Sequence, residues 1–253
     1  TNGPTGDIEN LDLLFAENIK EVNLLLKEKN TRLLPSAAHP LMNPVTETEL
    51  WKHSSSKIYA LYNRIFDCSG HGWSNVQSMH INLPFFDDAE FEKLHAAVRL
   101  LLPIIPALSA SSPIFEGKDT GFKDARMQVY KTNQKEIPEM TGKVIPEQVF
   151  SKDDYYKTIF EPINKKIKPH DTENILDHFL NSRGAIARFD RNAIEIRVID
   201  VQECPKADMA IAIFIIECLK LLVSEDLIAI SKQKKWHEND LFEIFDAVIK
   251  DAE

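Results

Sequence analysis

Two separate segments place ionisable side chains on one face of a predicted strand, opposite an apolar face. The segment NVQSMHINLPFF (75–86) carries His80 among polar residues that alternate with apolar ones, and AIEIRVID (193–200) carries Glu195 and Arg197 in the same alternation. A period of two residues is typical of half-buried strands. If the two strands are neighbours, an imidazole and a carboxylate can ligate a hard divalent cation, while the guanidinium of Arg197 meets phosphate oxygens.

Each motif alone also fits an ordinary structural role. A lone histidine on the polar face of a strand is commonly a surface or hydrogen-bonded residue, and Glu195 with Arg197 is typical of a solvent-facing ion pair. Two strands that both carry ionisable groups opposite an apolar face favour a binding site more than either strand does alone.

A basic loop with glycines is a second candidate for anion binding. The stretch SSPIFEGKDTGFKDAR (111–126) places Lys118, Lys123 and Arg126 close to two glycines. These cations could cover an anionic ligand, although a solvated charged loop has the same composition. It is not a Walker loop, because the Gly-Lys pair is followed by Asp and no glycine stands at the required position before it.

The cysteines favour neither a disulfide framework nor a zinc site. Cys68, Cys204 and Cys218 are odd in number and lack CxxC spacing, so a reducing cytoplasm is the simplest setting. Cys68 lies near His71 in the sequence, but without an orienting carboxylate an incidental thiol is the better interpretation than a nucleophile.

Composition excludes several classes of protein. The chain has 253 residues, of which 43% are hydrophobic, and a net charge of -9, which argues against non-specific binding to a nucleic-acid backbone. The most apolar run (209–223) is too short and too charged for an ordinary membrane span and is interpreted as a buried core helix. We therefore expect a soluble globular protein with no membrane and no nucleic-acid partner, and the sequence leaves a homo-oligomer open.

The pattern of helices and strands is that of an α+β protein. Thr46 and Glu49 have capping-box spacing, Pro103 and Pro106 interrupt or end a helix, and the stretch 111–146 has little periodicity and is interpreted as a long ordered loop. Apolar spacing predicts the remaining helices, and alternation predicts the strands. We expect helices over 7–29, 46–66, from 87 to the prolines, 206–224 and 238–252, and strands at 75–86 and on both sides of a tight turn at 190–192.

Several motifs occur in the order found in a known family. The segments SAAHP, QSMHINLPF, PALSASSPIFEGKDTGFKDAR and AIEIRVIDVQECP resemble those of the carboxylate-amine ligases, also called type 2 glutamate-cysteine ligases. The resemblance implies a glutamine synthetase-like fold, in which a curved, mainly antiparallel sheet surrounds the active site and helices pack on its outer face. It also implies that ATP activates a carboxylate as an acyl phosphate, that an amine then attacks to form an amide, and that Mg²⁺ and arginines assist.

The resemblance assigns roles on the first strand. The family's His-Val-His-Val-Gly strand falls on 78–82, so that its second histidine, a metal ligand in related ligases, is His80. Ser78 stands in place of the first histidine and Asn82 in place of the glycine. The geometry of the ligands on this strand is therefore expected to differ from that of the family.

The remaining roles fall on charged residues further along the chain. Glu195 corresponds to a metal-binding carboxylate and Arg197 to a phosphate-facing arginine. Arg126 corresponds to the arginine that ends the Asp-Thr-Gly loop, and Arg188 to one on the preceding strand. Arg197 and Arg126 are the expected catalytic residues; the expected ATP-binding residues are Arg197, Arg188, Lys118 and Lys123.

The beginning of the chain departs from the family pattern. Family members open with a strand of the type Gly-Ile-Glu-Leu-Glu and a second acidic stretch, which supply most metal-binding carboxylates, whereas this chain opens TNGPTGDIEN. We expect a single, partial ligase domain over 1–253 that joins a glutamate-like acid to a cysteine-like amine. The alternatives are a non-catalytic relative that binds an amino acid or nucleotide, and a different phosphoryl-transfer enzyme such as a guanidino kinase relative.

Overall fold

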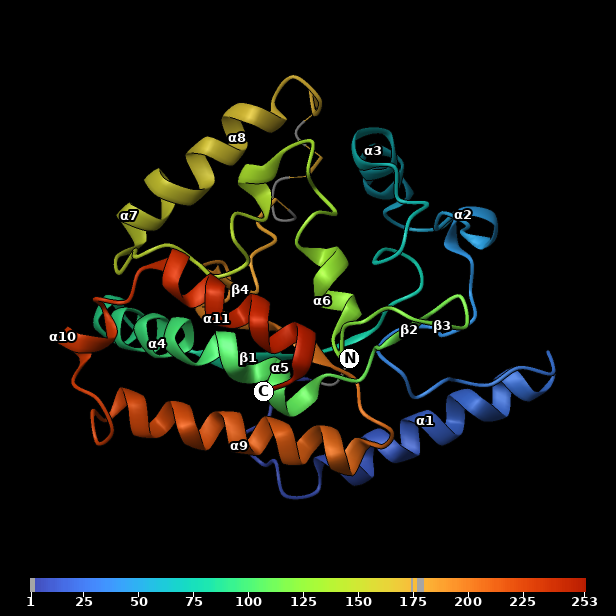
Figure 1. Cartoon of the computed structure of the whole chain (residues 1–253), viewed down its shortest axis with the longest axis horizontal. Helices are drawn as coiled ribbons and strands as arrows, with labels where there is room; N and C mark the ends of the chain where they lie inside the picture. Colours follow the sequence, from blue (N-terminus) through green and yellow to red (C-terminus); the bar gives the residue numbers. More distant parts are fainter. Residues whose placement is uncertain (1–2, 174, 177–179) are drawn as a thin grey trace.

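Three antiparallel strands form the sheet that carries the polar residues (Figure 1). The central strand β5 (Ala193–Asp200) pairs with β1 (Ser78–Pro84) on one side and with β4 (Ala185–Arg188) on the other. The computed structural model describes residues 3–173, 175–176 and 180–253. The predicted strand and the predicted hairpin are therefore confirmed, and Asn192 in the turn adopts φ 49°.

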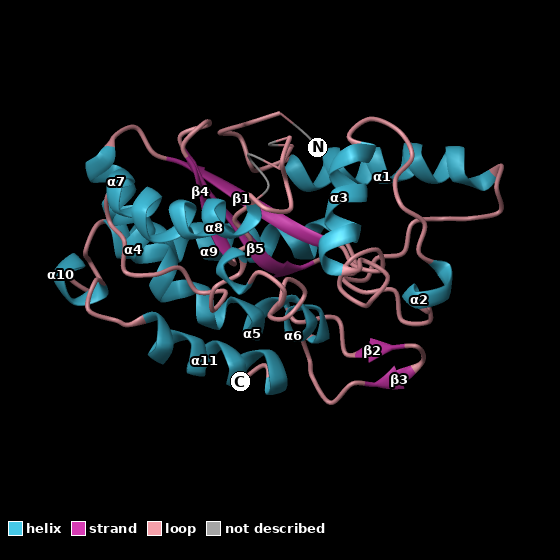
Figure 2. Cartoon of the chain, turned by 90° about the horizontal axis from the view of Figure 1, so that it is seen from above, coloured by secondary structure: helices cyan, strands magenta, loops and turns pink. Residues whose placement is uncertain are grey.

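One face of this sheet forms the core together with helices. Ile196 and Val198 of β5 are fully buried and belong to one apolar cluster with Val98, Ile215 and Phe245 from three helices. Figure 2 shows α5 and α11 on one side of the three strands. The mixture of an antiparallel sheet and packed helices confirms the α+β class. In the described residues the α-helices are α1 (Leu11–Lys27), α2 (Pro44–Glu47), α3 (Ser56–Phe66), α4 (Asp88–Leu101), α5 (Ile105–Ser109), α6 (Ala125–Tyr130), α7 (Lys152–Tyr155), α8 (Glu161–Ile167), α9 (Pro205–Val223), α10 (Ile230–Gln233) and α11 (Glu238–Asp251).

Prolines divide the helical region after β1, as the sequence predicts. The helix α4 begins where the Asp87 side chain accepts a hydrogen bond from the backbone of Glu90, an N-cap that satisfies one free N–H group. It ends before a 3-10 turn, Leu102–Ile104, that contains Pro103, and α5 begins directly afterwards. Because proline has no backbone N–H, it cannot continue the hydrogen-bond ladder of α4.

The apolar run near the C-terminal end is an amphipathic core helix. One face of α9 is buried, including Ile215 and Leu219, whereas Phe214 is 54% exposed. Among the residues that the structure describes, no helix combines the length and the apolar character needed to cross a membrane. The predicted helices 206–224 and 238–252 are thus confirmed as α9 and α11.

The prediction of one helix over 46–66 is wrong. The structure has a single turn, α2, capped by Asn43, whose side chain accepts from the backbone of Val45. Thr48 is extended, and the chain re-enters a helix only at α3. Ser54 and Ser55 precede α3, and serine side chains compete with helical backbone hydrogen bonds. The Thr46–Glu49 spacing therefore does not start the helix.

The stretch 111–146 is more regular than predicted. It contains a short hairpin of β2 (Ile114–Phe115) and β3 (Lys118–Asp119), and then α6. Gly117 occupies the hairpin turn at φ 73°, a left-handed conformation that glycine adopts without strain. Short elements like these carry too few residues to show a periodic pattern in the sequence.

Candidate active site

A β-bulge shapes the polar face of the sheet. Asn82 of β1 pairs with Glu195 of β5, but beyond an irregularity between Met79 and Ile81 the register shifts, and Ser78 pairs with Asp200. Two residues of β5 therefore lie opposite one residue of β1. After this bulge, the side chains of β5 point to the opposite face from the one that simple alternation predicts. The bulge brings Asp200 to the same face as Ser78, although simple alternation assigns it to the apolar face.

Glu195 lies among three basic side chains on this face. Its carboxylate is 3.3 Å from Nδ1 of His80, 3.0 Å from Nε of Arg197 and 3.6 Å from Nη1 of Arg188. The Glu195 side chain is only 9% exposed. The hydrogen bond with His80, supported by the charges of Arg197 and Arg188, outweighs burial and holds the pKa of Glu195 below its ordinary value. The sequence-predicted metal and phosphate residues are thus brought together.

Ser78 contributes to the position of His80. Its Oγ lies 2.9 Å from Nε2 of His80, while Nδ1 of the same ring faces Glu195. Both ring nitrogens of His80 therefore have partners. The serine that departs from the family pattern orients the histidine that follows it.

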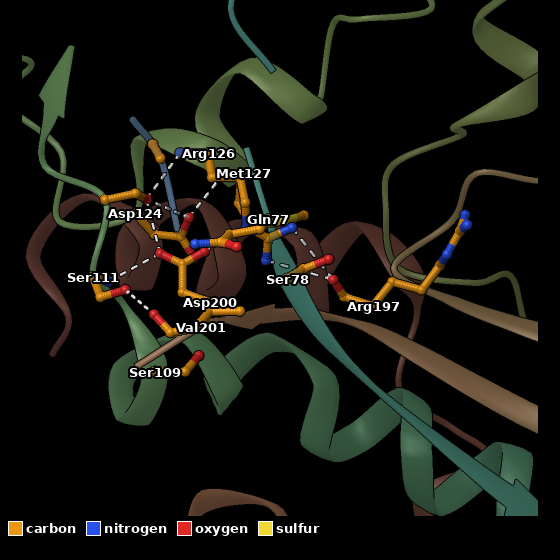
Figure 3. Close-up of polar contacts among 12 residues, drawn as sticks. Gln77, Ser78, Ser109, Ser111, Asp124, Arg126, Met127, Arg197, Asp200 and Val201 are labelled. Carbon is orange, nitrogen blue, oxygen red and sulfur yellow. Dashed lines mark hydrogen bonds and ion pairs between the residues drawn. The ribbon is translucent and has the colours of Figure 1, made fainter. Parts of the chain in front are cut away.

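Arg126 reaches the same region from α6. Asp124 caps α6 by accepting a hydrogen bond from the backbone of Met127 at 2.8 Å. The Nε of Arg126 forms an ion pair with Asp200, and its terminal nitrogens lie 3.4 and 3.5 Å from the carbonyl oxygen of Arg197. Figure 3 shows these contacts, with the Arg197 side chain extending away from Asp200. The two predicted catalytic arginines are neighbours.

The buried carboxylate of Asp200 holds Arg126 in place. Asp200 accepts hydrogen bonds from the backbone of Ser111 at 2.9 Å and from the hydroxyl of Ser112 at 2.8 Å, in addition to its ion pair with Arg126. Burial, together with the nearby charge of Asp200, raises the pKa of Asp124 to about 7. The sequence analysis missed Asp200 and Asp124. An acidic residue at an apolar position of a predicted strand is the signal that points to Asp200.

A cavity of about 210 Å³ lies between these groups. Its walls come from β1, β5, α6 and the loops around them, so that charged and aromatic side chains face a common space. Arg188 lies outside it, makes a two-point contact with Asp190 at 2.9 and 3.0 Å, and lines a second cavity. The residues that line the first cavity are Gly72, Trp73, Ser78, His80, Arg126, Tyr130, Asn133, Gln134, Ser182 and Arg197.

The two lysines of the basic loop do not line either cavity. Lys118 is exposed on β3, and Lys123 is exposed just before α6, where its backbone N–H donates to the carbonyl of Lys250. A role for these lysines in covering a nucleotide stays a prediction. The Cys68 thiol is buried, and burial raises its pKa to about 11, which does not suit a nucleophile at neutral pH.

The candidate metal-binding side chains, His80 and Glu195, can hold only a metal ion that takes its remaining ligands from a substrate or from water. Among the described residues, no group of three or more His, Cys, Asp or Glu side chains is arranged to hold a metal. His80 and Glu195 supply one nitrogen and one carboxylate. Mg²⁺ prefers six oxygen ligands and is commonly held by one or two carboxylates together with phosphates and water. The pair therefore fits Mg²⁺ that arrives with a nucleotide, with Glu195 as the stronger ligand.

Comparison with known proteins places the chain in a family. The profile of glutamate-cysteine ligase family 2 (GCS2) matches residues 3–243. The chain belongs to that family. It is also 36% identical over 222 residues to an uncharacterized protein of Archaeoglobus fulgidus. That alignment covers 88% of this chain and 60% of the relative, so the chain spans about 60% of the length of the protein it matches.

Proposed function

We propose that the protein is an ATP-dependent carboxylate-amine ligase whose sheet has the glutamine synthetase-like arrangement. The observation that carries this proposal is the convergence of His80, Arg188 and Arg197 on Glu195, beside Arg126, on one polar face. A cluster of fixed cations stabilises a transferring phosphoryl group better than water does, because it needs no reorganisation during the reaction. Membership of the family supports this interpretation.

The reaction consists of two balanced steps. A carboxylate oxygen of the acid substrate attacks the γ-phosphorus of ATP, and the bond to the bridging oxygen breaks to release ADP. The amine then attacks the acyl carbon, inorganic phosphate leaves with the bonding electrons, and the nitrogen loses a proton to give the amide. Mg²⁺ bound with the nucleotide would neutralise phosphate charge.

The residues of this chain would bind and orient the anions. Arg197 and Arg126 would face the transferring phosphoryl group, and Arg188 would contact the rest of the nucleotide. Glu195 keeps the guanidinium groups of Arg197 and Arg188 close to one another before the substrate binds. Preorganisation of this kind reduces the entropy cost of assembling the site.

The test is ATP consumption by the complete protein that depends on both an acid and an amine, with glutamate and cysteine as the first pair. Glu195→Gln and His80→Ala should each lower this activity on the order of 10²-fold, the effect of removing one preorganised electrostatic group. Glu217→Gln is the matched control, because Glu217 pairs with Lys220 on the exposed surface of α9. Unchanged activity in both site variants would sink the assignment.

A second candidate function is a non-catalytic relative that binds a nucleotide or an amino acid. The observation that favours it is that no group of three or more His, Cys, Asp or Glu side chains within the described residues is arranged to hold a metal, with Ser78 at the position of a family histidine. Calorimetry with Mg-ATP separates the two candidates. Saturable binding without product, with any acid and amine pair supplied, would favour the second.

A further inference from the structure

A second cavity opens at the other end of the polar face. It has a volume of about 290 Å³ and lies beside β4, one of the two edge strands of the described sheet. Three aromatic rings, from Tyr156, Phe160 and Phe189, line it together with the amides of Asn164 and Asn181. Flat apolar walls with a few polar groups are typical of small-molecule sites. The first cavity contains a different set of residues.

A π-helical turn presents two of these rings. Residues Tyr156–Phe160 form this turn between α7 and α8. Such turns are rare and occur often at functional sites, because they widen the helix at the cost of regular hydrogen bonding. Tyr156 and Phe160 stand at its two ends, with ring centroids 5.0 Å apart.

The Tyr156 ring is supported on one side and open on another. It stacks on Phe189 with centroids 5.7 Å apart and an interplanar angle of 26°, yet the residue is 45% exposed. A large aromatic residue that is stacked but still half exposed offers a flat surface to a second ring. Asn164 is also exposed, and its side chain makes no hydrogen bond within the described chain. It can therefore pair with the polar edge of such a ring.

Arg188 connects this cavity with the first one. It lines the aromatic cavity, and its Nη1 lies 3.6 Å from Oε2 of Glu195, which contacts His80 and Arg197 of the first cavity. A ligand with an aromatic end and an anionic end can therefore extend from the rings, past the guanidinium of Arg188, to the cations around Glu195. Of the substrates of the proposed reaction, only the nucleotide has this shape, because glutamate and cysteine contain no ring.

We propose that the cavity lined by Tyr156, Phe160 and Phe189 binds the purine base of the nucleotide, with the base stacked on Tyr156. This proposal rests on the proposed function for the identity of the nucleotide. It adds the place and the orientation of the ligand: base at β4, ribose and α-phosphate near Arg188, and the reacting phosphoryl group beside Arg197 and Arg126.

The experiment measures binding of adenosine and of Mg-ATP to the complete protein by ligand-observed NMR and calorimetry. Tyr156→Ala should raise the dissociation constant of both about tenfold, because stacking on an aromatic ring contributes this much per base. Tyr156→Phe should bind like the wild type. Tyr59→Ala is the matched control, since Tyr59 is 47% exposed on α3 and lines neither cavity. Circular dichroism checks that each variant is folded.

The outcomes separate this proposal from the proposed function. Weaker adenosine binding in Tyr156→Ala alone supports the base site even if no amide product forms. Equal loss in Tyr156→Ala and Tyr59→Ala, unchanged binding in Tyr156→Ala, or no adenosine binding to the wild type would overturn the base site. Amide formation with an unaltered KM for ATP in Tyr156→Ala would overturn it while leaving the ligase assignment intact.

Discussion

Glu195 compensates a concentration of positive charge that would otherwise be costly to bury. Its side chain is 9% exposed, and the hydrogen bond with His80 and the charges of Arg197 and Arg188 explain why its pKa lies below the ordinary value despite burial. Arg188 and Arg197 carry the same charge and repel each other. The carboxylate of Glu195 contacts both of them and compensates this repulsion. A polyphosphate that enters the site would share these arginines with Glu195.

Asp200 is the counter-ion of Arg126, and we expect stability to depend on it. The two side chains are 0% and 4% exposed. Asp200→Ala should destabilise the protein by about 3–5 kcal/mol, because the guanidinium of Arg126 is left buried without its counter-ion. Urea denaturation followed by circular dichroism measures the change in the free energy of unfolding.

The double variant Arg126→Met, Asp200→Leu serves as the control for this pair. Replacing both members of a buried ion pair by apolar residues is often neutral or stabilising, so the double variant should be more stable than Asp200→Ala alone. A loss in the double variant that equals the sum of the losses in Arg126→Met and Asp200→Leu would show that the pair makes no specific contribution.

At the scale of elements, the junction before β4 determines how closely two strands and a loop approach. The N–H of Gly184 donates to the carbonyl of Val144 at 2.7 Å, and its carbonyl accepts from the N–H of Arg197 at 2.8 Å. A Cβ at this position would lie 2.6 Å from Cγ1 of Val198 and 2.8 Å from Cγ1 of Val144. Only glycine allows this packing without displacement of the strand that carries Arg197.

Gly184→Ala should therefore lower the free energy of unfolding by about 1–3 kcal/mol, the usual cost of overpacking a core. Thermal and urea denaturation measure the loss. Gly70→Ala is the matched control, because no atom lies within 4 Å of the Cβ that it would add. In Gly184→Ala, Val198→Ala the two losses should be less than additive, since the smaller side chain relieves the clash; strict additivity would contradict this account.

Two buried groups, His95 and Asp124, give the stability of the protein opposing dependences on pH. His95 of α4 is fully buried, and burial, followed by the charge of Arg99, lowers its pKa from 6.5 to about 3. Asp124 has its pKa raised from 3.8 to about 7. The folded state therefore binds fewer protons than the unfolded state at His95 between pH 3 and 6.5, and more at Asp124 between pH 4 and 7.

Replacing either group should leave only the pH dependence that the other group gives to the free energy of unfolding. Stability from His95 is lost as the pH falls from about 6.5 towards 3, so His95→Phe should gain stability relative to the wild type in that direction. Stability from Asp124 is lost as the pH rises from about 4 to 7, so Asp124→Asn should gain relative stability as the pH rises. The slopes should approach about 1.4 kcal/mol per pH unit for one proton.

Urea midpoints measured at intervals between pH 4 and 8 test both slopes. The exposed Asp226→Asn variant provides a control, since it changes a carboxylate on the surface. Parallel pH profiles for the wild type and both buried-site variants would contradict the assignment of these protons.

Much of the element pattern could be predicted from the sequence because it depends on near neighbours. The alternation in 78–84 and 193–200 and the helices α9 and α11 follow from periodicity, and the end of α4 follows from its prolines. The prediction of one helix over 46–66 was wrong because it rested on the capping-box spacing of Thr46 and Glu49. Asn43 instead caps a single turn that begins earlier in the chain. The residue types and motifs also predicted that His80, Glu195 and Arg197 share one face.

Only the tertiary structure decided how these residues are joined. The bulge opposite His80 turns Asp200 towards Arg126, which is 74 residues away in the chain, and no local pattern records that contact. Likewise, the ring of Tyr156 from the π-helical turn stacks on the ring of Phe189, which follows β4. The sequence by itself determined the kinds of side chain and the face of each strand, because these follow from local spacing. Register, burial and distant ion pairs depended on packing, because they arise from contacts between segments that the chain brings together only when it folds.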